Sequence, residues 1–265
     1  MSDLSVETIR VLRRDDGVAL VTLARPEVHN AFNEAMIAEL TKALTRLDGD
    51  VSVRAVVLAA DGKSFSAGAD LAWMRRMAGY DAAGNLADAQ ALAELMRTLN
   101  SLSKPTIARV HGAAYGGGVG LVACCDIAVA SETAVFGLTE VRLGLIPAVI
   151  SPYVIAAIGA RAARRWFLTA ERFDAAEAWR LGLIHQVTQL EGLDDAVETL
   201  LFRLREGAPG AQRAAKDLIF AMSDRPVSDA LIADSAGRIA ALRVADEGRE
   251  GIKAFLEKRA PRWGE

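Results

Sequence analysis

The chain has 265 residues, of which 52% are hydrophobic and 25% are charged, so it can bury a substantial core and disorder is not expected. Its 31 basic and 34 acidic residues nearly balance, which argues against a nucleic-acid-binding arm or a polybasic membrane anchor. The two cysteines, Cys124 and Cys125, are adjacent in an apolar stretch, which excludes a disulfide framework and favours a reducing cytoplasm. Residues 1–14 lack the apolar centre of a signal peptide, so we expect a soluble cytoplasmic protein.

The chain opens with the pattern of a β-hairpin followed by a helix. Apolar and polar residues alternate over 8–12 and 19–23, around the turn Asp15-Asp16-Gly17. Asn33 then precedes a run with helical spacing over 35–47 and is a suitable N-cap for it. The continuous apolar run over 55–59 is typical of a strand that is covered on both faces.

A strand followed by a glycine-bearing turn occurs three times in the middle of the chain. The strands over 55–59, 106–110 and 134–136 lead into the turns over 62–68, 112–118 and 137–144. This weak repetition predicts stacked units that each contribute strands and a helix. From residue 174 onward the pattern is almost wholly helical, with amphipathic segments over 194–206, 211–222, 228–245 and 248–258. We expect a catalytic core over 1–195 and a helical oligomerisation region over 196–265, which needs a surface to pack on.

Five glycines lie within nine residues at one strand-to-helix junction: Gly112, Gly116, Gly117, Gly118 and Gly120. Such crowding suggests that a ligand approaches the main chain closely, with N–H groups directed at it. The dinucleotide spacing GxGxxG fails, because Leu121 stands where its last glycine should be. Gly62-Lys63-Ser64 lacks the first glycine of a phosphate loop, and the three histidines have no metal-ligand spacing. We therefore expect no metal, nicotinamide, flavin or ATP.

Residues 64–71, Ser-Phe-Ser-Ala-Gly-Ala-Asp-Leu, form a second turn with the same pattern of strand, small residues and helix start. Two such turns that face one spot would present two free backbone N–H groups as an oxyanion hole, and we place the donors at Ala69 and Gly117. Glu140 is the candidate acid–base group, since desolvation in its apolar segment should raise its pKa. The alternative is an exposed Glu140, or one paired with Arg142.

Four segments together resemble the crotonase, or enoyl-CoA hydratase/isomerase, superfamily: HGAAYGGGVGL with CCDIAVA (111–121 and 124–130), SFSAGADL (64–71), FGLTEVRLGLIP (136–147) and FLEKRAPRW (255–263). The resemblance extends over nearly the whole chain. It implies an α/β fold in which β-β-α units stack in a spiral, as in ClpP and crotonase, with a C-terminal helical trimerisation region. It also implies acyl-CoA thioester substrates, assembly as trimers or hexamers, and no cofactor beyond the coenzyme A of the substrate.

The same resemblance implies that Ala69 and Gly117 bind the thioester oxygen and that Glu140 is the catalytic carboxylate. Arg25 is expected near the nucleotide, and Lys258 is expected to reach coenzyme A in an adjoining subunit, with plain surface charge as the alternative for both. Trp73 and Met74 are candidates for the acyl pocket, with core packing as the alternative. The full set of expected substrate-binding residues is Arg25, Ala67, Gly68, Asp70, Leu71, Trp73, Met74, Tyr115, Gly116, Pro147 and Lys258.

The chain departs from the family pattern at Gly120, where family hydratases carry a second glutamate. Two carboxylates suit hydration, whereas one suits double-bond isomerisation. The segments 66–77 and 140–154 are similar to bacterial methylglutaconyl-CoA hydratase-like members, and a glycine at 120 would leave room for a branched or carboxylated acyl group. We expect hydration of a 2-enoyl-CoA first and Δ3–Δ2 isomerisation second.

A non-catalytic subunit or RNA-binding homologue is the alternative of another class. The nearest approach to an RNA-binding surface is the group Arg161, Arg164, Arg165 and Arg172. An ordinary solvated helix face explains these residues better in a chain with a net acidic balance, so no nucleic-acid partner is expected.

Overall fold

The computed structural model describes residues 4–5 and 7–264, so part of the segment 1–14 lies outside the described residues. Its larger sheet has seven strands in the order β1 (Leu4–Ser5), β2 (Ile9–Arg13), β3 (Val18–Leu23), β4 (Ala55–Ala60), β6 (Thr106–Val110), β8 (Ile127–Ser131) and β11 (Gln186–Thr188). The pairs β1–β2 and β2–β3 are antiparallel, and every pair from β3 to β11 is parallel. A smaller sheet has the order β10 (Arg172–Asp174), β9 (Val135–Gly137), β7 (Ala113–Tyr115) and β5 (Ser64–Ser66).

The two sheets are built by a repeated unit, in which one strand enters the larger sheet, the next enters the smaller sheet and a helix follows. The first unit is β4, β5, α2 (Leu71–Met77) and α3 (Ala82–Asn100), and the second is β6, β7 and α4 (Gly117–Cys124). The third is β8, β9, the 3-10 helix η2 (Glu140–Leu143) and α5 (Ser151–Thr169). The predicted α/β spiral of stacked β-β-α units is confirmed.

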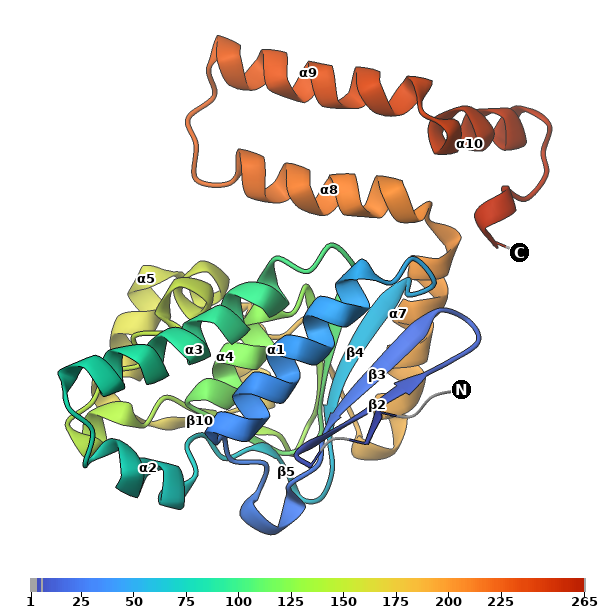
Figure 1. Cartoon of the computed structure of the whole chain (residues 1–265). Helices are drawn as coiled ribbons and strands as arrows, with labels where there is room; N and C mark the ends of the chain where they lie inside the picture. Colours follow the sequence, from blue (N-terminus) through green and yellow to red (C-terminus); the bar gives the residue numbers. More distant parts are fainter. Residues whose placement is uncertain (1–3, 6, 265) are drawn as a thin grey trace.

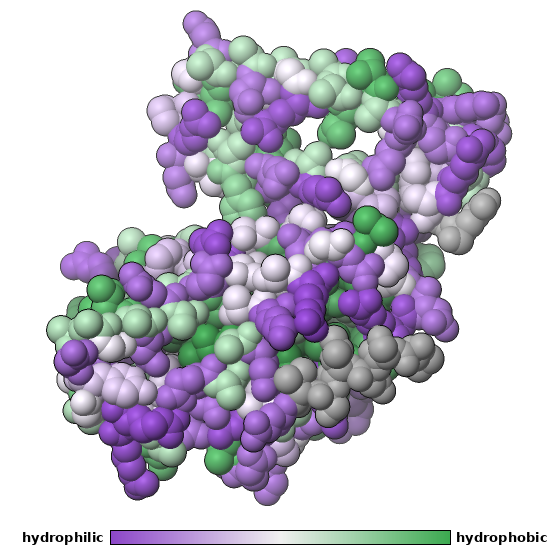
Figure 2. Space-filling view, viewed as in Figure 1, coloured by the Kyte–Doolittle hydropathy of each residue, from purple (hydrophilic) through white to green (hydrophobic). Residues whose placement is uncertain are grey.

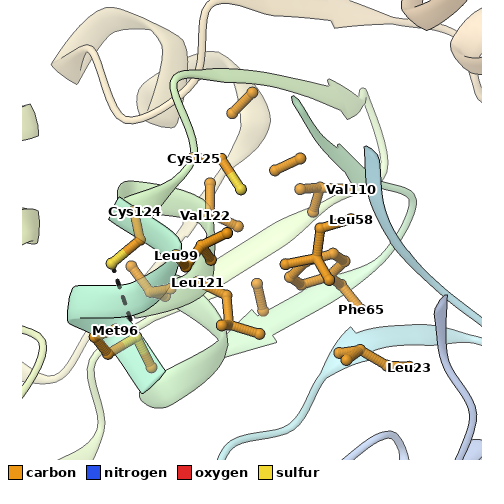
Figure 3. Packing of buried hydrophobic residues seen from close by; sticks show 14 of the residues in the cluster. Leu23, Leu58, Phe65, Met96, Leu99, Val110, Leu121, Val122, Cys124 and Cys125 are labelled. Atoms are coloured by element: carbon orange, nitrogen blue, oxygen red, sulfur yellow. Dashed lines mark hydrogen bonds between the residues drawn. The ribbon is translucent and has the colours of Figure 1, made fainter. Parts of the chain in front are cut away.

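Helices cover both faces of the larger sheet, and the alternation of side chains along each strand decides which helix they meet. Val56 and Leu58 of β4 join the main core with α1 (Glu34–Gly49), α3 and α4. Ala55 and Val57 join a second cluster with α7 (Leu193–Glu206) on the opposite face (Figure 1). Figure 3 shows the main core around Phe65, where α3 and α4 pack against the strands.

The expected hairpin and first helix are confirmed. Strands β2 and β3 pair from Ile9 with Leu23 to Arg13 with Ala19. Asn33 caps α1, because its side-chain oxygen accepts a hydrogen bond of 2.9 Å from the backbone N–H of Met36. Further along, the region after residue 174 is almost wholly helical, as expected, but it also contains the short strand β11, which pairs with β8. A strand of three residues is too short to show a period of two in the sequence.

The last three helices form an arm that stands apart from the body (Figure 1). They are α8 (Pro209–Met222), α9 (Asp229–Val244) and α10 (Asp246–Leu256), followed by η4 (Arg262–Gly264). Polar contacts tie the arm to the body, among them an ion pair and a hydrogen bond: Lys216 Nζ lies 2.8 Å from Asp126 Oδ2, and Arg54 donates a 2.8 Å hydrogen bond to the carbonyl of Trp263. The predicted boundary at 195 falls inside α7, which packs on the sheet through Leu193, Ala196, Val197 and Leu201. The remaining elements are α6 (Ala175–Leu181), η1 (Pro26–Val28) and η3 (Leu190–Gly192).

Among the described residues, no helix has both the length and the apolar composition that crossing a bilayer requires. In the same part of the chain, no group of three or more His, Cys, Asp or Glu side chains is placed to hold a metal ion.

Candidate active site

The three residues expected to carry the chemistry each follow a different strand of the smaller sheet. Ala69 comes after β5, Gly117 follows β7 with Gly116 between them, and Glu140 comes after β9. These strands are parallel neighbours, with β7 in the middle, so their carboxyl ends meet at one edge with about 4.8 Å between strands. The fold therefore brings Ala69, Gly117 and Glu140 to the same edge, with Gly117 between the other two.

The backbone of Ala69 is oriented by a short parallel bridge to Phe32. The N–H of Phe32 donates to the carbonyl of Gly68 at 2.7 Å, and the N–H of Asp70 donates to the carbonyl of Phe32 at 2.9 Å. In a parallel pairing of this kind, the N–H of the residue between the two bonds points away from the partner. The N–H of Ala69 is thus directed away from Phe32, and it has no protein acceptor among the described residues.

The N–H of Gly117 is free for a different reason. Gly117 is the first residue of α4, and the first N–H groups of a helix have no acceptor within it. The preceding turn is fixed to the end of β9, because the N–H of Gly116 donates to the carbonyl of Gly137 at 2.9 Å. The phenyl ring of Phe32 lies against this turn, since a Cβ built on Gly117 would be 3.0 Å from its Cε2 atom.

Gly116 lets the carboxylate of Glu140 approach the turn. Its backbone, at φ 51° and ψ −117°, lies in a region that residues with a side chain rarely adopt. A Cβ at this position would be only 2.9 Å from Glu140 Oε1. A glycine is therefore required both for the turn itself and for the space that the carboxylate occupies, next to the N–H of Gly117.

The carboxylate of Glu140 is not satisfied by the protein. Its Oε2 atom is buried and has no hydrogen-bond partner among the described residues. Burial raises the pKa of the Glu140 carboxyl above its ordinary value, and a hydrogen bond from its own backbone N–H offsets only part of this effect. Among the described residues, Glu140 makes no ion pair with Arg142, and the Arg142 side chain is exposed. A half-buried, unsatisfied carboxylate is typical of a group kept for proton transfer.

The surroundings of Glu140 differ in part from the apolar setting that the sequence suggested. Phe136 and Leu138 are fully buried, but Leu143, Leu145 and Ile146 are more than half exposed. The turn at Gly116 lies against the Glu140 carboxylate, and Leu143, Leu145 and Ile146 do not form the apolar enclosure that the sequence suggested.

This pKa shift makes a prediction for stability. Because folding raises the pKa of Glu140, the folded state holds the proton more tightly, and this stabilising contribution is lost as pH rises through the folded-state pKa. We expect Glu140→Gln to raise the Tm at pH 8 by roughly 1–4 °C and to have little effect near pH 4. Thermal denaturation across this pH range is the measurement. Glu171→Gln is the control of opposite sign, because Arg165 lowers the pKa of the Glu171 carboxyl; a Tm of Glu140→Gln below that of the wild type at pH 8 would contradict the prediction.

Arg25 and Asp70 brace the turn that carries Ala69. Arg25 Nη2 lies 2.8 Å from Asp70 Oδ2, and its Nη1 donates to the carbonyl of Ala31 at 2.6 Å. Asp70 also caps α2 by accepting from the N–H groups of Ala72 at 2.7 Å and Trp73 at 3.2 Å. Although burial alone would raise the pKa of the Asp70 carboxyl, the hydrogen bonds from Arg25 and from the two N–H groups bring it below its ordinary value. Arg25, which was expected near the nucleotide, thus binds Asp70 and the carbonyl of Ala31 within the protein.

The other expected binding residues occupy varied places. Ala67 donates its N–H to the carbonyl of His29 at 2.9 Å, and the carbonyl of Tyr115 would be 3.2 Å from a Cβ on Gly68. Tyr115 is half buried, with the Arg172 guanidinium 5.0 Å from its ring centroid.

Around α2 the expected pocket residues differ in exposure. Trp73 is buried in the main core, and its indole N–H donates to Asp88 at 2.9 Å, whereas Met74 is half buried and Leu71 is largely exposed. Pro147 is buried, and Lys258 is exposed just after α10, on the arm. Contact of these residues with a substrate stays a prediction.

Gly120 does not leave the open space that the sequence suggested. A Cβ built there would overlap Cγ2 of Ile150, would be 2.9 Å from its Cβ and would be 3.3 Å from Cε of Met96. The expectation that this glycine makes room for a branched acyl group is therefore wrong. Sequence reasoning did not single out Ile150, nor Phe32 beside the turn at Gly117. Both are apolar residues that only the fold brings to the site, and no local pattern distinguishes them from core residues.

Comparisons with known proteins agree with this arrangement. The family model for enoyl-CoA hydratase/isomerase matches residues 13–265. A solved structure of an enoyl-CoA hydratase from Shewanella pealeana is 46% identical and has a TM-score of 0.94, covering 97% of this chain and 96% of that one. The 2,3-dehydroadipyl-CoA hydratase of Escherichia coli is 33% identical over 95% of this chain and 96% of its own length. A Thermus thermophilus protein assigned to the enoyl-CoA hydratases is 37% identical over 93% of this chain and 97% of its own length. The chain belongs to the enoyl-CoA hydratase/isomerase family of enzymes.

Proposed function

We propose that this protein hydrates 2-enoyl-CoA thioesters to 3-hydroxyacyl-CoA thioesters. One observation carries the proposal. The half-buried carboxylate of Glu140, with an unsatisfied oxygen, lies beside the turn of Gly117. Among the described residues, the N–H groups of Gly117 and of Ala69 in the neighbouring turn have no protein acceptor. Hydration needs this combination, a pair of donors for the thioester oxygen and a group that moves a proton. The names of relatives, among them a crotonyl-CoA hydratase of Syntrophomonas wolfei at 33% identity, support the same reaction.

In the proposed mechanism the thioester oxygen accepts hydrogen bonds from the N–H groups of Ala69 and Gly117. These bonds strengthen as the oxygen gains negative charge, which stabilises the enolate. Glu140 takes a proton from water while the water oxygen bonds to the β-carbon, and Glu140 then gives a proton to the α-carbon. One water is added across the double bond and the carboxylate is regenerated. Coenzyme A is part of the substrate, and the scheme draws on no further cofactor.

A branched 2-enoyl-CoA of the methylglutaconyl-CoA kind is the finer substrate assignment within this proposal. It rests on the similarity of residues 66–77 and 140–154 to such hydratases, because the volume argument at Gly120 does not hold. Isomerisation of a 3-enoyl-CoA is the second candidate, favoured by the glycine at 120. A single carboxylate at Glu140 is enough to remove the α-proton and return it at the γ-carbon.

A panel of coenzyme A esters separates these reactions. Purified protein is incubated with straight-chain 2-enoyl, branched 2-enoyl and 3-enoyl esters, and the absorbance of the conjugated thioester is followed. Hydration removes this absorbance, whereas isomerisation of a 3-enoyl ester creates it. We expect loss of absorbance with the 2-enoyl esters and the fastest loss with the branched one. A protein that changes the absorbance of none of the esters would overturn the proposed function.

The bracing role of Arg25 makes a second prediction. Removing its charge leaves Asp70 without its ion-pair partner and loosens the turn that carries Ala69, so Arg25→Met should lower kcat by about tenfold or more while KM changes little. Steady-state kinetics on a 2-enoyl ester measure kcat and KM separately. Arg10→Met, which removes an exposed arginine paired with Asp61, is the control. A rise in KM at unchanged kcat would instead assign Arg25 to coenzyme A binding.

We further propose that three or six copies assemble through the arm. Large apolar side chains are exposed along it, with Phe255 at 83%, Leu256 at 73% and Ile219 at 63%. Figure 2 shows apolar residues on the arm, beside the opening between α8 and α9. Exposed apolar surface of this extent on an ordered arm needs a partner to cover it.

Light scattering should therefore return the mass of three or six chains. Phe255→Glu should shift this mass toward the single chain, because it puts a charge into the apolar contact. Val51→Glu changes a residue that is 93% exposed on the body and is the control, expected to leave the mass unchanged. A single-chain mass for the wild type at micromolar concentration would contradict the assembly.

A further inference from the structure

Position 120 has no room for a side chain while Ile150 is in place. The built Cβ at Gly120 overlaps Cγ2 of Ile150 and lies 2.9 Å from its Cβ, well inside the distance at which carbon atoms normally meet. The Cβ of an isoleucine is attached directly to the backbone and cannot rotate away. A residue larger than glycine at 120 therefore requires the chain before α5 to move.

Ile150 is held firmly at this place. It is the N-cap residue of α5, its carbonyl accepts a 3.0 Å hydrogen bond from the N–H of Val154, and its side chain is 3% exposed. Met96 of α3 closes the other side of the space, and its sulfur accepts a hydrogen bond from the thiol of Cys124 at 3.8 Å (Figure 3). The space beside Gly120 is thus filled by two apolar side chains from two helices.

The filled space lies next to the catalytic carboxylate. Gly116 and Gly120 are four residues apart, and the N–H of Gly120 donates to the carbonyl of Gly116 at 3.2 Å, so the two residues lie about one helical turn, or 5.4 Å, apart at the start of α4. Gly116 faces Glu140 Oε1, and Gly120 faces Ile150. The carboxylate of Glu140 and the side chain of Ile150 therefore approach the start of α4 at residues that lie one turn apart.

We propose that Ile150, together with Gly120, is a specificity-determining pair that keeps a second carboxylate away from the reacting carbons. The inference rests on the proposed function and deepens it. With Ile150 in place, Glu140 carries both proton transfers: it takes a proton from water and returns one to the α-carbon in hydration, or moves one from the α-carbon to the γ-carbon in isomerisation. The balance between the two reactions is then set by what occupies the space of Ile150.

A double-mutant cycle tests the steric part without a substrate. Gly120→Ala should lower the Tm by about 4 °C or more, because it forces a methyl group into filled space. In the Ile150→Gly background the same change should cost much less, and glycine is tolerated at the N-cap position of Ile150. Ile158→Ala, two turns further along α5, is the control background, in which the cost of Gly120→Ala should be unchanged. Equal Tm losses in all three backgrounds would overturn the inference.

The functional part is read from the ratio of hydration to isomerisation. Gly120→Glu combined with Ile150→Gly should raise this ratio by about tenfold over Ile150→Gly alone, because a second carboxylate can then position water. An unchanged ratio in a folded double variant would leave Ile150 a packing residue only and overturn the specificity assignment. A wild-type protein that converts no enoyl ester would overturn the proposed function, and this inference with it, whatever the melting temperatures show.

Discussion

Replacing Glu140 by glutamine is expected to abolish turnover of the enoyl ester while binding of the ester survives. Glutamine has nearly the same shape but can neither accept the proton of water nor deliver one to carbon. General acid–base catalysis by a positioned side chain contributes about 10²–10⁴-fold, so kcat should fall by at least that range if Glu140 performs both transfers. Steady-state turnover of a 2-enoyl ester and calorimetric titration with an unreactive saturated acyl-CoA measure the two halves of this expectation.

The control is Glu132→Gln, a change of the same kind at an exposed residue after β8, which should leave kcat unchanged. The pH profile of the wild type adds a second test. Because Glu140 must be deprotonated to accept a proton from water, kcat should rise with pH through a midpoint above the ordinary pKa of a glutamate, which is 4.5. Unchanged turnover of Glu140→Gln would remove Glu140 from the mechanism, however well the site is arranged.

Much of the fold could be predicted from the sequence, because its strongest signals are local. Asn33 precedes a run with helical period, and it caps α1 in the structure. The apolar run at 55–59 becomes β4, which is buried on both faces, and the run at 106–110 coincides with β6. The amphipathic segments expected from residue 194 onward correspond to α7, α8, α9 and α10 to within two residues at either end. These elements are long enough for the period of the apolar residues to be read.

Only the part of the site that the repeated turns form could be predicted from the sequence. The strands expected at 55–59 and 106–110 are β4 and β6, and the segments expected as turns after them contain the short strands β5 and β7. Together with β9, these two strands bring the site residues to one edge of the smaller sheet. The bridge between Phe32 and Ala69, the ion pair of Arg25 with Asp70 and the filling of the space at Gly120 by Ile150 each join residues 30 to 45 positions apart. Such contacts depend on how the units stack, and no local pattern reports them.

The oxyanion hole is predicted to be as necessary as the carboxylate, and α4 allows one of its donors to be removed cleanly. Gly117 is the first residue of the helix, where proline is tolerated because the N–H has no intrahelical acceptor. Gly117→Pro therefore removes the N–H that is assigned to the thioester oxygen without removing a helix hydrogen bond. Loss of one oxyanion donor costs about 10²–10³-fold in kcat, and we expect a fall of that size for Gly117→Pro in the same assay.

Gly117→Ala is the matched control, because it adds the same Cβ against the ring of Phe32, 3.0 Å from Cε2, but keeps the N–H. The alanine variant reports the steric cost of a side chain at 117, and the difference between the two variants reports the cost of losing the donor. Equal Tm values for the two variants would show that the fold is not responsible for that difference. If the proline variant then turned over the ester within a few-fold of the alanine variant, the thioester oxygen would have to be bound by other groups. The assignment of Gly117 would then fail while that of Glu140 could still stand, because the two residues follow different strands.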